Sequence, residues 1–112
     1  MFDWRLYQND QLIEEYLSLN VLDNIYKVDD CLSYNYNDKL VTKKTDEYMV
    51  IIDLNNGKMS VKIDSDGIDG ELSLHKYEIT DNDKELVLIY QVSEEEPINK
   101  IIISRRELWK KH

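Results

Sequence analysis

The chain has 112 residues and a formal net charge of −9, and it contains one cysteine, one proline, three glycines and no alanine. A chain of that length predicts a single domain, residues 1–112, built around one core. Because Cys31 is alone, an intramolecular disulfide is excluded. The sequence has no apolar run long enough to span a bilayer and no signal peptide, which predicts a cytoplasmic protein outside the membrane.

The charge is unevenly distributed. Residues 98–112 carry five lysines and arginines against Glu107, so residues 1–97 have a formal charge of −13. An acidic body repels phosphate backbones, which argues against direct nucleic-acid binding, and it attracts a partner with a basic surface.

The N-terminal third of the chain predicts helices. Asp10 can cap a helix, and two apolar stripes at helical spacing follow it. They are Leu12, Ile13, Tyr16 and Leu17, and then Val21, Leu22, Ile25 and Tyr26. Position 21 lies about half a turn out of register with position 12. We therefore expect two short helical segments with a break and a second cap near Asn20.

Residues 29–64 contain the clearest strand pattern. The segment 29–39, DDCLSYNYNDK, fits either a strand or an ordered loop, and both remain open. Two alternating runs then flank Asn56–Gly57, which predicts a β-hairpin with a two-residue type I′ turn. In that register the facing apolar pairs are Leu54 with Met59, Ile52 with Val61, and Val50 with Ile63.

The last third predicts further strands and a closing helix. Residues 71–79 suggest one strand interrupted by a bulge, 85–92 a central strand and 98–104 another strand. Ser104 and Glu107 have the spacing of a capping box, which predicts a short basic helix to the C-terminus. The expected fold is therefore α+β: N-terminal helical segments packed on a meander-like antiparallel sheet of about five or six strands, with a short C-terminal helix.

Residues 62–71, KIDSDGIDGE, invite comparison with a calcium-binding loop. An EF-hand needs oxygen ligands at positions 1, 3 and 5, glycine at position 6 and glutamate at position 12. Placing Gly67 at position 6 puts Lys62 at position 1 and Ser73 at position 12. A cation at the first ligand position repels calcium, so the segment is interpreted as an acidic turn.

The sequence offers no recognisable catalytic or metal-binding constellation. The only histidines are His75 and His112, which lie far apart in sequence from each other and from Cys31. A zinc site needs closely spaced Cys and His ligands, and a phosphate loop needs more glycine than this chain has. We therefore predict a protein without enzymatic activity, cofactor or metal.

The remaining signal is acidic surface. The predicted partner-binding residues are Asp64, Asp66, Asp69, Glu71, Glu94, Glu95 and Glu96. Alternate turns of a meander lie at the same end of a sheet, so at least two acidic turns could form one negative rim. Tyrosines beside them suit an interface. Acidic turns that only maintain solubility and discourage edge pairing explain the same residues.

Three functions follow from this pattern. The first is a small acidic inhibitor that docks on the basic, nucleic-acid-binding surface of a partner protein, as immunity proteins and phage-encoded anti-defence proteins do. The second is an assembly module that forms a homo-oligomer or a larger complex through its sheet. The third is an enzyme or small-molecule binder, which would need a pocket lined by tyrosines together with a carboxylate of raised pKa.

Overall fold

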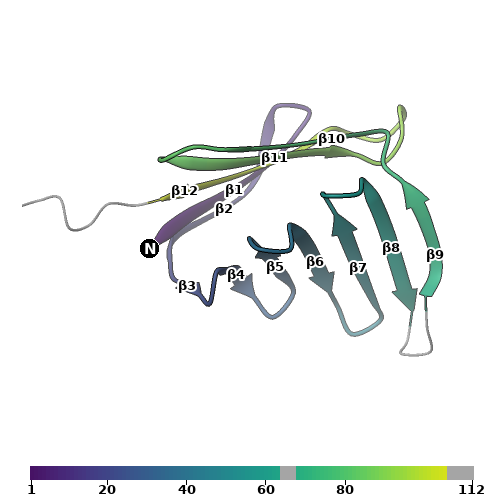
Figure 1. Ribbon diagram of the computed structural model, residues 1–112, viewed down its shortest axis with the longest axis horizontal. Coiled ribbons are helices and arrows are strands. Elements are labelled where there is room, and N and C mark those ends of the chain that lie inside the picture. Colours follow the sequence, from purple (N-terminus) through teal and green to yellow (C-terminus); the bar gives the residue numbers. More distant parts are fainter. Residues whose placement is uncertain (64–67, 106–112) are drawn as a thin grey trace, which may run out of the picture.

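All regular secondary structure in the described part of the chain is β-strand. The computed structural model describes residues 1–63 and 68–105, and twelve strands form two antiparallel sheets (Figure 1). The five-stranded sheet has the order β10–β11–β12–β1–β2, and its strands are β1 Phe2–Gln8, β2 Gln11–Leu19, β10 Lys76–Asp81, β11 Glu85–Gln91 and β12 Asn99–Arg105. The seven-stranded sheet follows chain order, with β3 Val21–Leu22, β4 Ile25–Asp29, β5 Leu32–Asn35, β6 Leu40–Lys44, β7 Tyr48–Asp53, β8 Lys58–Ile63 and β9 Ile68–Ser73.

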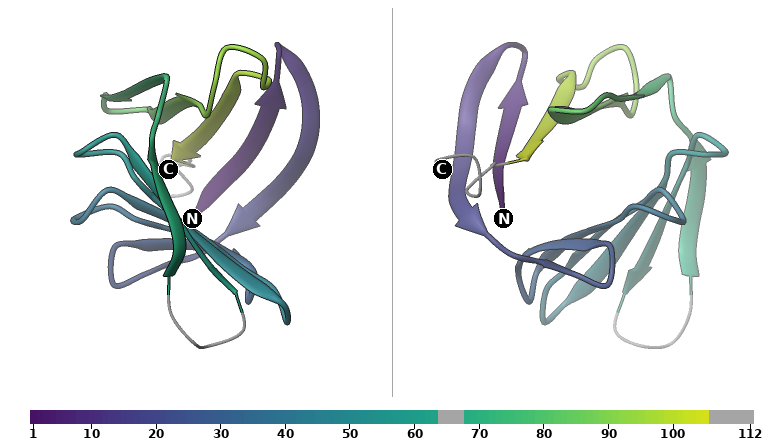
Figure 2. Two further views of the ribbon diagram at one scale, coloured as in Figure 1. Left: turned by 90° about the vertical axis from the view of Figure 1, so that its right-hand side faces the viewer. Right: turned by 60° about the vertical axis from the view of Figure 1, so that its left-hand side comes forward.

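The chain passes between the sheets twice. It leaves the five-stranded sheet at Asn20, between β2 and β3, and returns at Leu74–His75, between β9 and β10. These connections lie on opposite sides of the molecule, and the strands of the two sheets run crosswise (Figures 1 and 2). Strands that neighbour each other in sequence are also paired within each sheet, and β12 closes the arrangement by pairing with β1.

The predicted N-terminal helices are wrong. Phe2, Trp4 and Leu6 alternate along β1 and face the other sheet, while Asn9 and Asp10 have φ of 49° and 67° and connect β1 to β2. Asparagine and aspartate tolerate this left-handed backbone, as a two-residue type I′ turn requires. Asp10 therefore reverses the chain and does not cap a helix.

The second predicted helix fails for the same reason. Asp23 and Asn24 have φ of 51° and 64° and form the two-residue connection between β3 and β4. In β2, which corresponds to the first predicted helix, register shifts in the β1–β2 ladder interrupt the alternation of residues between the two faces of the strand. Neighbouring apolar residues therefore occur at spacings that also fit a helix.

The core lies between the sheets. Phe2, Trp4 and Leu88 of the five-stranded sheet are fully buried, as is Tyr34 of the seven-stranded sheet. The ring of Phe2 packs edge-on against that of Tyr26, with ring centroids 5.0 Å apart. Large aromatic side chains from both sheets thus supply much of the apolar area removed from water.

The predicted β7–β8 hairpin is confirmed, but its register is wrong by two residues. Val50 lies opposite Val61, and Ile52 lies opposite Met59. The loop has four residues because Asp53 accepts hydrogen bonds from the backbone N–H groups of Asn55 and Asn56, at 2.9 and 3.2 Å. A shift of two keeps every side chain on its predicted face, so the apolar face is the expected one.

The C-terminal third differs from expectation in two places. Residues 71–79 form the end of β9 and most of β10, which belong to different sheets, instead of one bulged strand. Ser104 and Arg105 are the last residues of β12, so Ser104 does not begin a helix. The rest of the predicted helix, residues 106–112, lies outside the described residues. The predicted strands at 85–92 and 98–104 correspond to β11 and β12.

The segment 29–39 contributes the end of β4, the short strand β5 and a turn before β6, so it combines strand and loop. Among the described residues no helix has the length and apolar character needed to cross a membrane. The protein is thus all-β in its described part, and the α+β class is wrong.

Gly57 and Gly70 provide a matched test of the β7–β8 loop. Gly57 has φ of +66°, and a Cβ added there would lie 2.2 Å from the Tyr77 ring, whereas nothing lies within 4 Å of a Cβ at Gly70. We expect Gly57→Ala to lower the free energy of unfolding by about 1–2 kcal/mol, measured by urea denaturation. Gly70→Ala should change it by less than about 0.5 kcal/mol. Equal losses for both variants would contradict this account of the loop.

Candidate functional site

The first predicted acidic cluster is only partly described. Asp64 and Asp66 lie outside the described residues, and Asp69 belongs to β9. Glu71 is exposed, and one of its carboxylate oxygens lies 3.9 Å from Nζ of Lys58 on the neighbouring strand. Its charge is partly compensated by that lysine, although an exposed pair of this kind contributes little to stability.

The second predicted cluster lies on a well-anchored loop. Glu94, Glu95 and Glu96 are exposed between β11 and β12. The backbone N–H of Glu96 donates to the carbonyl of Ser93 at 3.1 Å, and the side chain of Gln91 donates to the carbonyl of Glu96 at 2.8 Å. Among the described residues no ion pair involves these three carboxylates.

The described parts of the two clusters lie on different sheets. Glu71 belongs to β9 of the seven-stranded sheet, whereas Glu94–Glu96 connect β11 to β12 of the five-stranded sheet. The N–H of His75 at the β9–β10 junction donates to the carbonyl of Gln91, just before the Glu94–Glu96 loop. The expected negative rim, which assumed one continuous meander, stays a prediction because Asp64 and Asp66 lie outside the described residues.

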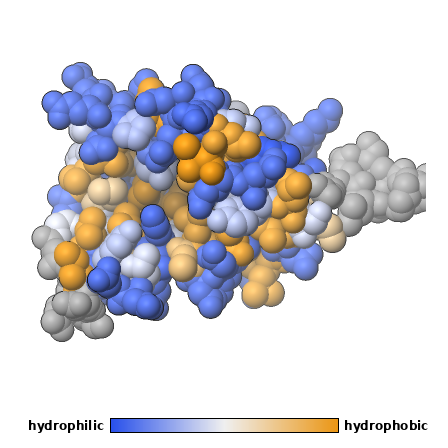
Figure 3. All heavy atoms as spheres, turned by 180° about the vertical axis from the view of Figure 1, so that it is seen from behind, coloured by the Kyte–Doolittle hydropathy of each residue, from blue (hydrophilic) through white to orange (hydrophobic). Residues whose placement is uncertain are grey.

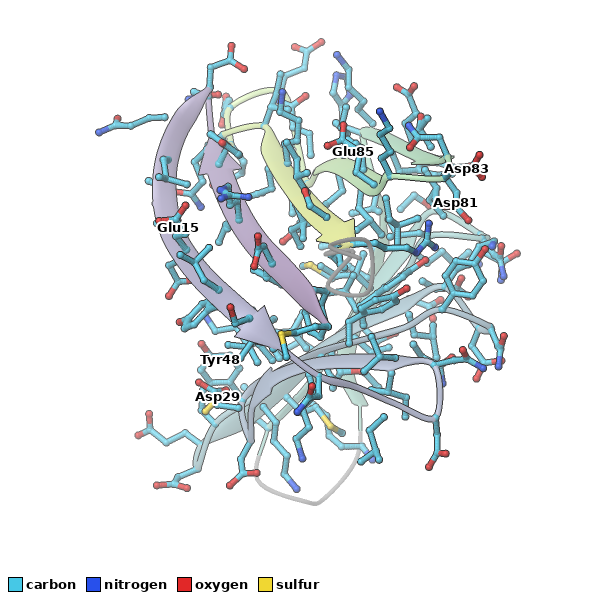
Figure 4. The ribbon with its side chains drawn as sticks, turned by 90° about the vertical axis from the view of Figure 1, so that its left-hand side faces the viewer. Glu15, Asp29, Tyr48, Asp81, Asp83 and Glu85 are labelled. Carbon is cyan, nitrogen blue, oxygen red and sulfur yellow. The ribbon has the colours of Figure 1, made fainter. Side chains whose placement is uncertain are left out.

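A third acidic group, not among the predicted site residues, lies on the β10–β11 turn. Asp81, Asp83 and Glu85 project from this turn in Figure 4. The hydroxyl of Tyr36 donates to the Asp81 carboxylate, and Nη2 of Arg105 lies 3.4 Å from its other oxygen. Asp81 therefore links the end of β12 to the turn after β5, and its charge is compensated within the molecule.

Tyrosines surround this link. Partial burial lowers the pKa of the Arg105 guanidinium, but interactions with Tyr26 and with the charge of Asp81 outweigh it, so the pKa is raised. Tyr34 stacks beside Tyr26 with ring centroids 6.1 Å apart. Its buried hydroxyl has no hydrogen-bond partner among the described residues, and burial raises its pKa to about 12.

A cleft opens between the two sheets at the other end of the β1–β12 ladder. Gln8 and Asn99, which line it, are paired at that end, whereas Phe2 and Arg105 are paired at the end that carries the tyrosine cluster. The cleft has a volume of about 380 Å³. Figure 3 shows a hollow on the back of the molecule in which apolar side chains reach the surface.

The floor of the cleft is apolar, and its mouth is polar. The floor includes Leu6, Leu32, Val50, Ile52, Met59 and Ile101. Glu14, Asp29 and Lys43 line the mouth and are exposed, and the half-buried Tyr48 also lines the cleft. The hydroxyl of Tyr16 donates to the Glu14 carboxylate at 3.3 Å.

Sequence reasoning did not identify the cleft residues. The apolar spacing predicts a helix that includes Glu14 and Tyr16, and residues 29–39 fit either a strand or a loop. The alternation of Phe2, Trp4 and Leu6 was the available signal, because it would have placed a strand before the Asn9–Asp10 turn and another after it. Nothing in the sequence indicated that Glu14 and Asp29 would line the same opening from different sheets.

Cys31 lines the cleft, and His75 does not. Cys31 is exposed, and its backbone N–H donates to the Asp29 carboxylate at 2.7 Å. His75 is exposed at the β9–β10 junction. Within residues 1–63 and 68–105, no three His, Cys, Asp or Glu side chains are grouped to hold a metal ion. The cleft thus provides an apolar surface for binding, with charged side chains at its opening.

Comparison with known proteins leaves the function to be inferred from these features, since no family model, curated protein or solved structure matches the chain.

The unpaired hydroxyl of Tyr34 leads to a prediction about stability. Tyr34→Phe removes a buried polar group that has no partner, so the free energy of unfolding at pH 7 should stay constant or rise by about 1 kcal/mol. The matched variant Tyr26→Phe removes a hydroxyl that interacts with Arg105 and should be less stable by about 1 kcal/mol. Urea denaturation measures both, and a clear loss of stability in Tyr34→Phe would contradict the assignment.

Tyr34→Phe should also change how the free energy of unfolding depends on pH above pH 10. The folded state holds the pKa of Tyr34 at about 12, above its ordinary value of 10.0. The stabilisation of the neutral hydroxyl is complete below pH 10 and is lost as the pH rises toward 12. Tyr34→Phe should therefore lose less stability than the wild type over that interval.

Proposed function

We propose that this protein is a non-enzymatic, cytoplasmic inhibitor that docks its acidic surface on a basic, nucleic-acid-binding surface of a partner protein. Immunity proteins and phage-encoded anti-defence proteins act in this way. The observation that carries the proposal is the loop Glu94–Glu96, which presents three exposed carboxylates from an anchored backbone. Asp64, Asp66, Asp69 and Glu71 remain predicted contacts.

The anchoring of the loop favours association. The backbone N–H of Ile98 donates to the side chain of Asn9 at 3.0 Å, and the N–H of Asn9 donates to the carbonyl of Ile98 at 3.0 Å. These two hydrogen bonds join the β1–β2 turn to the β11–β12 connection. The Glu94–Glu96 loop therefore loses little conformational freedom when a partner binds. A net charge of −9 adds long-range attraction toward a basic surface and speeds the encounter.

The proposal is tested by affinity capture of tagged protein from the source cell, washed at low and high salt. The expected result is a nucleic-acid-processing protein that is retained at low salt, lost at high salt and inhibited by the purified chain. The triple variant Glu94→Gln, Glu95→Gln, Glu96→Gln should associate with that protein about tenfold more slowly or worse. The control Asp46→Asn, Glu47→Gln, on the exposed β6–β7 turn, should associate normally. Equal association by both variants would remove the loop from the interface.

An assembly module is the second candidate, and one observation favours it. The nine-residue strand β2 is an edge of the five-stranded sheet, and it exposes 45% of Leu12, 47% of Ile13 and 49% of Leu17. A long edge strand with exposed apolar side chains can pair with another chain.

This candidate predicts a concentration-dependent molar mass that salt hardly changes. Ile13→Lys and Leu17→Lys should each keep the protein monomeric, as measured by light scattering after size-exclusion chromatography. Leu22→Lys is the control, because Leu22 is 66% exposed but lies on the short strand β3. A wild type that stays monomeric at high concentration would exclude this function.

A further inference from the structure

The cleft between the sheets has the dimensions of a binding site. Its volume of about 380 Å³ lies within the range of roughly 300–1,000 Å³ that is typical of small-molecule sites. Both sheets contribute to it: Leu6 and Ile101 come from the five-stranded sheet, and Val50 and Met59 from the seven-stranded sheet. A ligand there would contact side chains from both sheets.

The polarity of the cleft changes from floor to mouth. Its floor would bury a hydrocarbon or aromatic group, which is favourable by roughly 25 cal/mol per Å² of apolar surface removed from water. The carboxylates of Glu14 and Asp29 stand at the mouth, on different sheets. This arrangement suits a ligand with an apolar body and a polar head.

The charged side chains at the mouth of the cleft determine which polar head group a ligand should carry. The Tyr16 hydroxyl donates to Glu14, and its pKa is raised by burial and by the charges of Glu14 and Asp29. Both carboxylates line the cleft together with Tyr16. Lys43 is the one cationic side chain that lines the cleft in the described part of the chain. The local balance is negative, as is the net charge of −9.

We propose that the cleft binds a small organic cation, an amine with an alkyl or aryl body. The apolar body lies on Leu32, Val50 and Met59, and the charged nitrogen lies between Glu14 and Asp29. Charge complementarity selects a cation over a neutral or anionic molecule of the same shape. Lys43 opposes the ligand charge and limits the affinity. This site is separate from the Glu94–Glu96 loop and does not require a protein partner.

The test uses three probes of equal chain length. Octylamine, octan-1-ol and octanoate are titrated into the full-length protein at pH 7, and binding is followed by calorimetry and by backbone amide shifts in NMR spectra. Octylamine should bind saturably, at least about fivefold more tightly than octanol, and octanoate most weakly. The amide shifts should be largest around Leu32, Val50 and Met59.

Charge variants test the mouth with opposite expected signs. Glu14→Gln and Asp29→Asn should each weaken octylamine binding about threefold to tenfold, whereas Lys43→Gln should strengthen it by a similar factor. Octanol binding should change little in all three variants, and Glu94→Gln, outside the cleft, should leave both ligands unaffected. Val50→Phe should fill part of the cleft and weaken octylamine and octanol together.

Several results would overturn the proposal. These are no saturable octylamine binding, equal affinity for the three probes, octylamine shifts located away from the cleft, or charge variants that leave the affinity unchanged. If Val50→Phe fails to fold, the three charge variants still decide the outcome. Displacement of octylamine by a lysine- or arginine-containing peptide that binds at least tenfold more tightly would replace the small molecule with a protein side chain as the occupant.

Discussion

The pairing of β1 with β12 is the constraint on which the rest of the structure depends. It joins two strands from opposite ends of the described chain through seven residue pairs, from Phe2 with Arg105 to Gln8 with Asn99. Other paired strands are close in sequence, so their registers can be set by local turns. The β1–β12 ladder places Trp4 and Leu6 of β1 beside Ile103 and Ile101 of β12. These side chains join the core between the two sheets.

The two ends of that ladder have different surroundings. At the Phe2 end, the guanidinium of Arg105, the Asp81 carboxylate and the tyrosine hydroxyls connect the sheets, so this end is closed by polar contacts around aromatic rings. At the Gln8 end, the sheets leave an opening whose walls are apolar. Crossed sheets touch most closely where their inner faces overlap and diverge toward the corners. A cleft at one end is a consequence of that geometry.

The sequence predicted individual strands better than their assembly. The β7–β8 hairpin was recognised because alternation over several residues surrounds an unambiguous turn. Its register was missed because the side chain of Asp53 closes a longer loop than Asn56–Gly57 alone suggests. The Asn9–Asp10 turn was mistaken for a helix start, since aspartate suits both a cap and a left-handed turn. Pairing between Phe2 and Arg105 depends on contacts remote in sequence, and the cleft depends on how the sheets cross. Neither property is visible in local periodicity.

The remoteness of β1 from β12 also affects how the protein is made. Translation adds about 5–20 residues per second, so β1 leaves the ribosome several seconds before its partner strand β12 exists. During that interval the β1–β2 hairpin has a second open edge, and Phe2 and Trp4, which are 0% exposed in the folded protein, lack most of their cover. The cell must therefore keep a nascent chain with exposed aromatic side chains from associating until β12 has been synthesised.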